Sequence, residues 1–152
     1  MSLKHKVYDA SIWHNIFDSA VDPKWIEDYA DEYRRTWPNY RPEITPVALP
    51  EESISTFTLR SLTREQLAHV DRMEGQNKIR EIVAYGCVGW SGVLDSENKE
   101  FKPEFTKDDL GKRLTVGAVE YLNFFGFSAM MSMTLAGMLS TLIMSITRSL
   151  PR

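Results

Sequence analysis

Hydrophobic residues recur at intervals of three and four along much of this chain, the spacing that gives a helix one buried face. In the first twenty residues the spacing predicts a short amphipathic helix that is packed by aromatic side chains. Its apolar positions are Ile12, Trp13, Ile16 and Phe17.

A second helix is predicted between residues 22 and 37. Asp22-Pro23 can open it, because proline is tolerated in the first turn. Trp25, Ile26, Tyr29 and Tyr33 then follow at roughly helical spacing. The helix should end at Trp37-Pro38, since the residue before a proline is pushed out of the α region.

The pattern changes between residues 38 and 60. Four prolines from Pro38 to Pro50 interrupt any helical period, which predicts an ordered loop or an extended arm. Ser53 to Arg60 is rich in β-branched and aromatic residues and can place Phe57 and Leu59 on one face of a strand. We therefore expect a small β element near residues 47–60.

Helical spacing resumes after Thr63. Thr63-Arg-Glu-Gln66 has the form of a capping box, which starts a helix with Leu67, Val70 and Met73 on its inner face. Gly75-Gln76-Asn77 is expected to kink or split this helix before Ile79.

The stretch from Ile79 to Leu110 contains an unusual concentration of glycine around a tryptophan. Gly86 is placed to end a helix, and the glycines that follow indicate a tight connection with an aromatic plug. Thr106 then starts another helix, with Asp108 and Asp109 in its first turn. The residues predicted to be structural here are Gly86, Gly89, Trp90, Gly92, Phe101 and Phe105.

No charged side chain occurs in the 27 residues from Tyr121 to Thr147, a length that could span a bilayer. The segment also carries many hydroxyl side chains and a ladder of small residues at every fourth position, which favours close packing against protein. We expect it to bind other chains. The predicted partner-binding residues are Met130, Met131, Ser132, Met133, Leu135, Ala136, Met138, Ser140 and Leu142.

The methionines between 130 and 144 have two interpretations. Flexible, polarizable side chains suit surfaces that bind varied apolar partners, but they also fill irregular cores. The residues alone leave both interpretations open.

These elements predict a mainly α single domain covering residues 1–152. Its parts are the N-terminal helices (1–37), the proline-rich arm (38–52), a strand, helix and Gly-Trp connection (53–105), and an apolar C-terminal helical segment (106–152). The last part is expected to form one long apolar helix or a helical pair from Thr106 to Leu150.

Composition and charge limit the size of the core, the partners and the cellular compartment that we expect. The chain has 152 residues, of which 43% are hydrophobic, enough for one ordinary core. A net charge of −3 and the lack of basic clusters argue against nucleic acid. A single cysteine, together with an N-terminus that lacks an apolar signal segment, favours a reducing cytoplasm.

Residues with chemical reactivity are scattered. His5, His14, His69 and Cys87 show no catalytic or metal-ligand spacing, and capping of a helix explains Asp108-Asp109. We therefore expect no enzyme, no cofactor and no metal.

One stretch resembles a known family. Val88-Gly89-Trp90, Gly92-Val93, Asp95 and the later Phe101, Pro103 and Phe105 are similar to the tail assembly chaperones of tailed bacteriophages. Phe57 to Glu65 resembles the strand and helix start of those proteins. The resemblance implies a protein that binds the tape-measure protein and tail subunits in the host cytoplasm, as a homo-oligomer or in a larger assembly.

Two alternatives stay open. A virion structural protein, such as a head-tail joining or capsid-stabilising component, would bury the proline-rich arm and the apolar helix permanently against neighbours. A membrane-active DNA-ejection protein would use residues 121–147 as a span.

Overall fold

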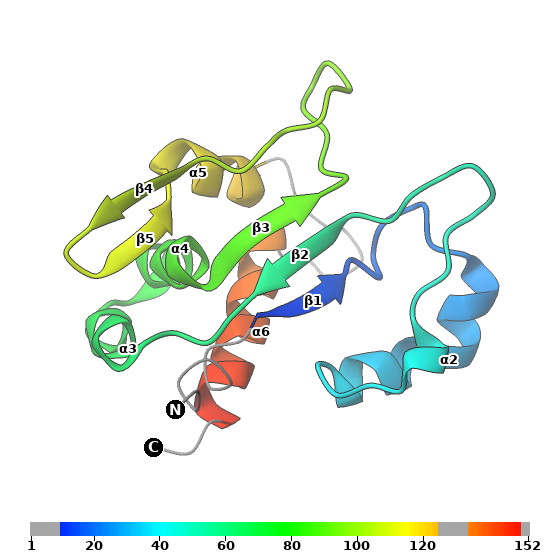
Figure 1. Ribbon diagram of the computed structural model, residues 1–152, viewed down its shortest axis with the longest axis horizontal. Helices are drawn as coiled ribbons and strands as arrows, with labels where there is room; N and C mark the ends of the chain where they lie inside the picture. The colour runs from blue at the N-terminus through cyan, green and yellow to red at the C-terminus, as the bar shows by residue number, and fades with distance from the viewer. Residues whose placement is uncertain (1–9, 125–133, 150–152) are drawn as a thin grey trace, which may run out of the picture. The chain divides into compact units, whose positions relative to one another are not determined.

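The computed structural model describes residues 10–124 and 134–149 (Figure 1). The strand order is β1-β2-β3 in one sheet and β4-β5 in a second. In chain order the elements are β1 (Ser11–His14), α2 (Pro23–Thr36), the 3-10 helix η1 (Pro42–Ile44), β2 (Thr56–Leu59), α3 (Arg64–Asp71), α4 (Gly75–Gly86), β3 (Cys87–Ser91), β4 (Phe105–Asp108), β5 (Gly111–Leu114), α5 (Val116–Phe124) and α6 (Leu135–Ser149).

Contacts divide the chain into two compact units. Unit 2 comprises Ile12–Phe57 and Trp90–Lys102, and unit 1 comprises the remaining described residues.

In unit 1, α4 is the central helix and packs against α3, α5, α6 and β5 (Figure 1). Ile82 and Val83 of α4, Leu122 of α5, and Leu139 and Ile143 of α6 are all buried. Burying them supplies most of the driving force for this packing. Gly86 ends α4, and a Cβ at this position would overlap three side-chain carbons of Ile143. The glycine therefore allows α6 to approach the end of α4 closely.

Unit 2 is built around aromatic side chains. Asp22 caps α2 by accepting a hydrogen bond from Lys24 N at 2.9 Å, and Trp37 ends the helix. Trp25 Nε1 donates to Ile44 O at 2.9 Å, which ties the proline-rich segment to α2. Tyr33, which is fully buried, packs against the rings of Trp25 and Tyr40.

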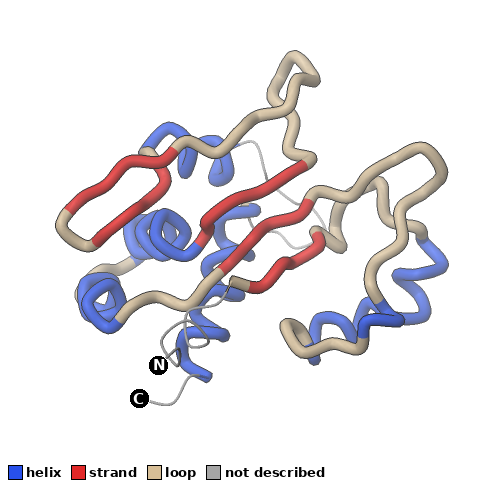
Figure 2. The backbone as a smooth tube through the Cα atoms, viewed as in Figure 1, coloured by secondary structure: helices blue, strands red, loops and turns tan. Residues whose placement is uncertain are grey.

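A hairpin occupies residues 105–114, where the sequence analysis predicts the start of a helix. Strands β4 and β5 pair antiparallel, from Phe105 opposite Leu114 to Asp108 opposite Gly111 (Figure 2). Gly111 has φ +115°, a conformation that favours glycine, and Leu110 N donates to Asp108 Oδ1. Asp108 thus stabilises a two-residue turn and does not cap a helix.

The predicted fold class is wrong: the structure is a mixture of helices and two small antiparallel sheets. Ser11–His14 is a strand and not part of a helix, and Cys87–Ser91 forms a strand in place of the predicted connection. The long apolar helix is not found among the described residues, where α5 and α6 are separate helices. Within residues 10–124 and 134–149, no helix combines the length and apolarity needed to cross a bilayer.

Several local predictions are confirmed. α2 begins after Asp22 and ends before Trp37-Pro38. The capping box is complete, with Thr63 and Gln66 bonded to each other's backbone N–H groups. The helix is split before Ile79, as predicted: α3 ends at Asp71, and Gly75, with φ +64°, is the first residue of α4. In each case the signal lies within a few neighbouring residues, so distant packing does not override it.

Candidate functional site

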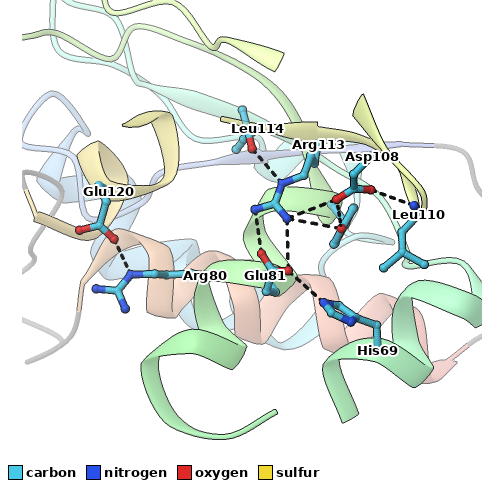
Figure 3. Close-up of polar contacts among 9 residues, drawn as sticks. His69, Arg80, Glu81, Asp108, Leu110, Arg113, Leu114 and Glu120 are labelled. Carbon is cyan, nitrogen blue, oxygen red and sulfur yellow. Dashed lines mark hydrogen bonds and ion pairs between the residues drawn. The ribbon is translucent and has the colours of Figure 1, made fainter. Parts of the chain in front are cut away.

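A polar cluster in unit 1 joins α3, α4 and the β4–β5 hairpin (Figure 3). Glu81 of α4 lies at its centre and forms a bidentate pair with Arg113 of β5, at 2.7 Å and 3.2 Å. His69 Nε2 of α3 lies 2.9 Å from Glu81 Oε1. Both Glu81 oxygens are therefore engaged, and the Glu81 and Arg113 side chains are only 17% and 16% exposed.

The hairpin contributes a second acid to the cluster. Tyr85 OH donates to Asp108 Oδ2 at 2.5 Å, and Arg113 Nη1 lies 3.5 Å from the same oxygen. The Arg113 guanidinium also stacks over the Tyr85 ring, 5.0 Å from its centroid. Gln66 Nε2 adds a further tie by donating to Leu110 O in the hairpin turn at 2.8 Å. These contacts hold the hairpin on α4 and α3.

Burial and the hydrogen bonds within the cluster shift the pKa values of Glu81, Asp108 and Tyr85. Burial alone would raise the pKa of Glu81, but hydrogen bonds from Arg113 and His69 outweigh it and lower that pKa. The hydrogen bond from Tyr85 lowers the pKa of Asp108, and burial followed by the bond to Asp108 raises the pKa of Tyr85 to about 12. At neutral pH the two carboxylates are charged and the phenol is neutral.

Beside this cluster lies a cavity of about 180 Å³ between α4 and α5. Val119 of α5 is 2% exposed, whereas Val116, at the first turn of that helix, is 71% exposed. Arg80 of α4 pairs with Glu120 of α5 near this cavity (Figure 3). We call this cavity the α4–α5 groove; its lining residues are Met73, Asn77, Arg80, Glu81, Arg113, Val116, Val119 and Glu120.

The chemistry of the groove suits binding of an apolar group. Its four charged side chains form two pairs, Arg80–Glu120 and Arg113–Glu81. A carboxylate that already accepts hydrogen bonds on both oxygens is a poor proton acceptor at neutral pH, because those bonds favour its charged form. Among the described residues, no group of three or more His, Cys, Asp and Glu side chains is arranged to hold a metal ion.

The predicted partner-binding residues fall into three groups. Met130, Met131, Ser132 and Met133 lie outside the described residues. Ala136 and Ser140 are buried within unit 1. Leu135, Met138 and Leu142 are half-buried on α6.

A second cavity, of about 370 Å³, includes Ser140 among its lining residues. Its other lining residues are Ile82, Thr141, Met144, Ser145 and Arg148.

The glycines and aromatic residues predicted to be structural have different surroundings. A Cβ at Gly92, which has φ +75°, would lie 3.2 Å from Ser55 Cα, whereas a Cβ at Gly89 would meet nothing within 4 Å. Trp90 is half-buried, stacks on Phe101 with centroids 5.9 Å apart, and donates from Nε1 to Phe101 O at 2.6 Å. Phe105 lies under the Lys112 ammonium.

The remaining candidate residues are the three histidines and the cysteine. His5 lies outside the described residues, and His14 contacts Tyr33 OH through Nδ1 at 3.3 Å. Burial raises the pKa of the Cys87 thiol to about 12, which favours the unreactive protonated form. His69 contacts Glu81 through Nε2 and stays about one-third exposed.

Sequence reasoning missed Glu81, Tyr85, Arg113 and Glu120. Glu81 and Tyr85 are four residues apart on α4 and therefore share a face. Asp108 and Arg113 are brought together by the hairpin turn. Recognising Asp-Asp-Leu-Gly as a turn would have placed these two opposite charges near each other, but their meeting with α4 is a tertiary contact.

Comparisons of this chain with known protein families, with curated proteins and with solved structures give no significant match.

Proposed function

We propose that this protein binds other proteins without catalysis, as a tail assembly chaperone for the phage tape-measure protein. The sequence pattern around Gly89, Trp90 and Gly92 supports the family, and the α4–α5 groove supports the mode of action.

The observation that carries the proposal is an exposed valine at the edge of the α4–α5 groove. Val116 is 71% exposed, next to the buried Val119. Covering such a side chain with a partner would contribute about 1.5–3 kcal/mol. The groove, at about 180 Å³, is smaller than the roughly 300–1,000 Å³ that hold drug-sized ligands, which favours a protein side chain as its occupant.

The proposed cycle needs no nucleotide. The client offers long amphipathic helices whose apolar faces would otherwise aggregate, and the chaperone covers part of each face. As tail-tube subunits assemble around the client, they compete for the same apolar surface and release the chaperone.

Co-expression tests this function. The tape-measure protein encoded in the same genome should be soluble and should co-purify when expressed with this protein, and should precipitate when expressed alone. Mass spectrometry of purified virions separates the main alternative, because a chaperone should be missing from mature particles. Stoichiometric recovery from virions would instead identify a structural component, such as a head-tail joining protein.

A further inference from the structure

Strand β4 forms an open edge of the two-stranded sheet in unit 1. Strand β5 lies between β4 and α4, and among the described residues β4 has no strand neighbour other than β5 (Figure 1). The residues from Thr106 to Asp108 are exposed. An exposed edge strand presents backbone donors and acceptors that another extended chain can pair with.

The register of the hairpin determines which backbone groups face this edge. Thr115 N donates to Glu104 O at 2.9 Å, so these two residues form a hydrogen-bonded pair. Hydrogen-bonded and non-hydrogen-bonded pairs alternate along an antiparallel ladder. The pairs that contain Phe105 and Lys107 are therefore non-hydrogen-bonded, and the N–H and C=O groups of both residues point away from β5. These groups are available to an added strand.

Two lysines lie directly opposite each other on the hairpin. Lys107 of β4 is paired with Lys112 of β5, so both side chains point to the same face. Like charges at such positions repel each other, and side chains approach most closely in non-hydrogen-bonded pairs. No described carboxylate forms an ion pair with either lysine. The positive charge beside the open edge is therefore uncompensated.

The face that carries the lysines is turned away from α4. Arg113 follows Lys112 in β5 and so points to the other face, where it pairs with Glu81 of α4. On the lysine face, Lys112 Nζ lies 4.4 Å from the centroid of the half-buried Phe105 ring. The open edge thus combines free backbone groups, two unpaired cations and one aromatic ring.

These features limit the chemistry of the occupant. A strand added to β4 would place one side chain beside Lys107 and, two positions along, another beside Phe105, both on the lysine face. A carboxylate in the first position would offset the repulsion between the lysines, and an apolar side chain in the second would cover the ring. The β4 strand of a second copy is unsuitable, because it would bring further lysines to the same face.

From these observations we infer that the open edge of β4 binds an extended acidic segment of a partner protein by strand addition. The segment carries Asp or Glu beside Lys107 and an apolar residue beside Phe105. Neither lysine lines the α4–α5 groove, so the inference does not rest on the proposed function.

A short peptide with blocked ends, Thr-Val-Thr-Glu-Thr-Val-Thr, tests the inference. Its sequence reads the same in both directions, so parallel and antiparallel addition present the same side chains. In an NMR titration we expect the amide signals of Phe105 and Lys107 to shift as hydrogen bonds form. The same peptide with lysine in place of glutamate should not bind. N-methylation of the glutamate and both valines retains the charge but blocks strand addition, so it should abolish binding.

Lys107→Glu reverses the charge at the edge. It removes the repulsion with Lys112 and should therefore fold. Binding of the acidic peptide should weaken about fivefold or more, and the lysine peptide should now bind. Lys24→Glu is the matched control, because it makes the same change in net charge at an 84% exposed side chain in unit 2.

Three results would overturn the inference. They are no amide shift at millimolar acidic peptide, equal binding of the N-methylated peptide, and equal binding by Lys107→Glu and wild type. The first would show that the lysines only protect the edge from pairing. The second would show charge attraction without strand addition, and the third would place the peptide elsewhere.

Discussion

The two units hold their irregular segments in place with different kinds of side chain. In unit 2, indole N–H groups donate to backbone carbonyls: Trp25 to Ile44, Trp37 to Ile12 and Trp90 to Phe101. In unit 1, the hairpin is held on α4 by Arg113, Glu81 and Asp108. The packing of aromatic rings does not depend on pH, whereas the charge of a carboxylate does. The two regions should therefore differ in their response to truncation and to pH.

The largest effect is expected from truncating an aromatic anchor in unit 2. Trp25→Ala should lower the free energy of unfolding by about 3–5 kcal/mol, because the ring is 4% exposed and its loss leaves a cavity. Trp25→Phe retains most of the ring but leaves Ile44 O without its donor, so it should cost less. Denaturant unfolding measures both, and hydrogen exchange should show the greatest loss of protection in residues 12–57. Equal costs for the two variants would mean that the hydrogen bond dominates.

Gly86→Ala should destabilise unit 1 by about 1–3 kcal/mol, since the added methyl group overlaps Ile143. Gly89→Ala is the matched control and should change stability by less than about 1 kcal/mol, because nothing lies within 4 Å of its Cβ. Combining Gly86→Ala with Ile143→Val should recover part of the loss. Thermal melts of wild type, Gly86→Ala, Gly89→Ala, Ile143→Val and the double variant measure these differences, and additive effects in the double variant would argue against direct contact.

Arg113→Ala should cost about 1–3 kcal/mol, because it leaves the largely buried Glu81 carboxylate with His69 as its remaining partner in the cluster. The pKa of Glu81 should rise, since burial is no longer opposed by the arginine. Pairing Arg113→Met with Glu81→Leu removes both charges and should recover stability. A double variant no more stable than Arg113→Ala would show that the hairpin needs the ion pair itself.

The smallest effect concerns acid pH. The pKa of Glu81 in the folded protein lies below its ordinary value of 4.5, so its stabilising contribution is complete above that value. The contribution is lost as the pH falls from about 4.5 through the lower folded pKa. Melting temperatures recorded across this range should fall less steeply for Glu81→Gln than for wild type. An unchanged slope would assign the acid sensitivity to other carboxylates.

The sequence by itself determined the features that depend on neighbouring residues. The start of α2 after Asp22, its end before Trp37-Pro38, the capping box at Thr63 and the break between Asp71 and Gly75 all follow from local backbone chemistry. Hydrogen bonds and φ preferences within one turn decide such positions, whatever the rest of the chain does.

Only the tertiary structure decided which short apolar runs became strands. Ser11–His14 fits helical and extended spacing equally over so few residues, and its place beside β2 settled the choice. Phe105–Leu114 became a hairpin because Gly111 allows the turn and because Glu81 supplies a partner for Arg113. The candidate site shares this origin: Glu81, Arg113 and Val116 are brought together by packing on α4, and no spacing along the chain encodes that contact.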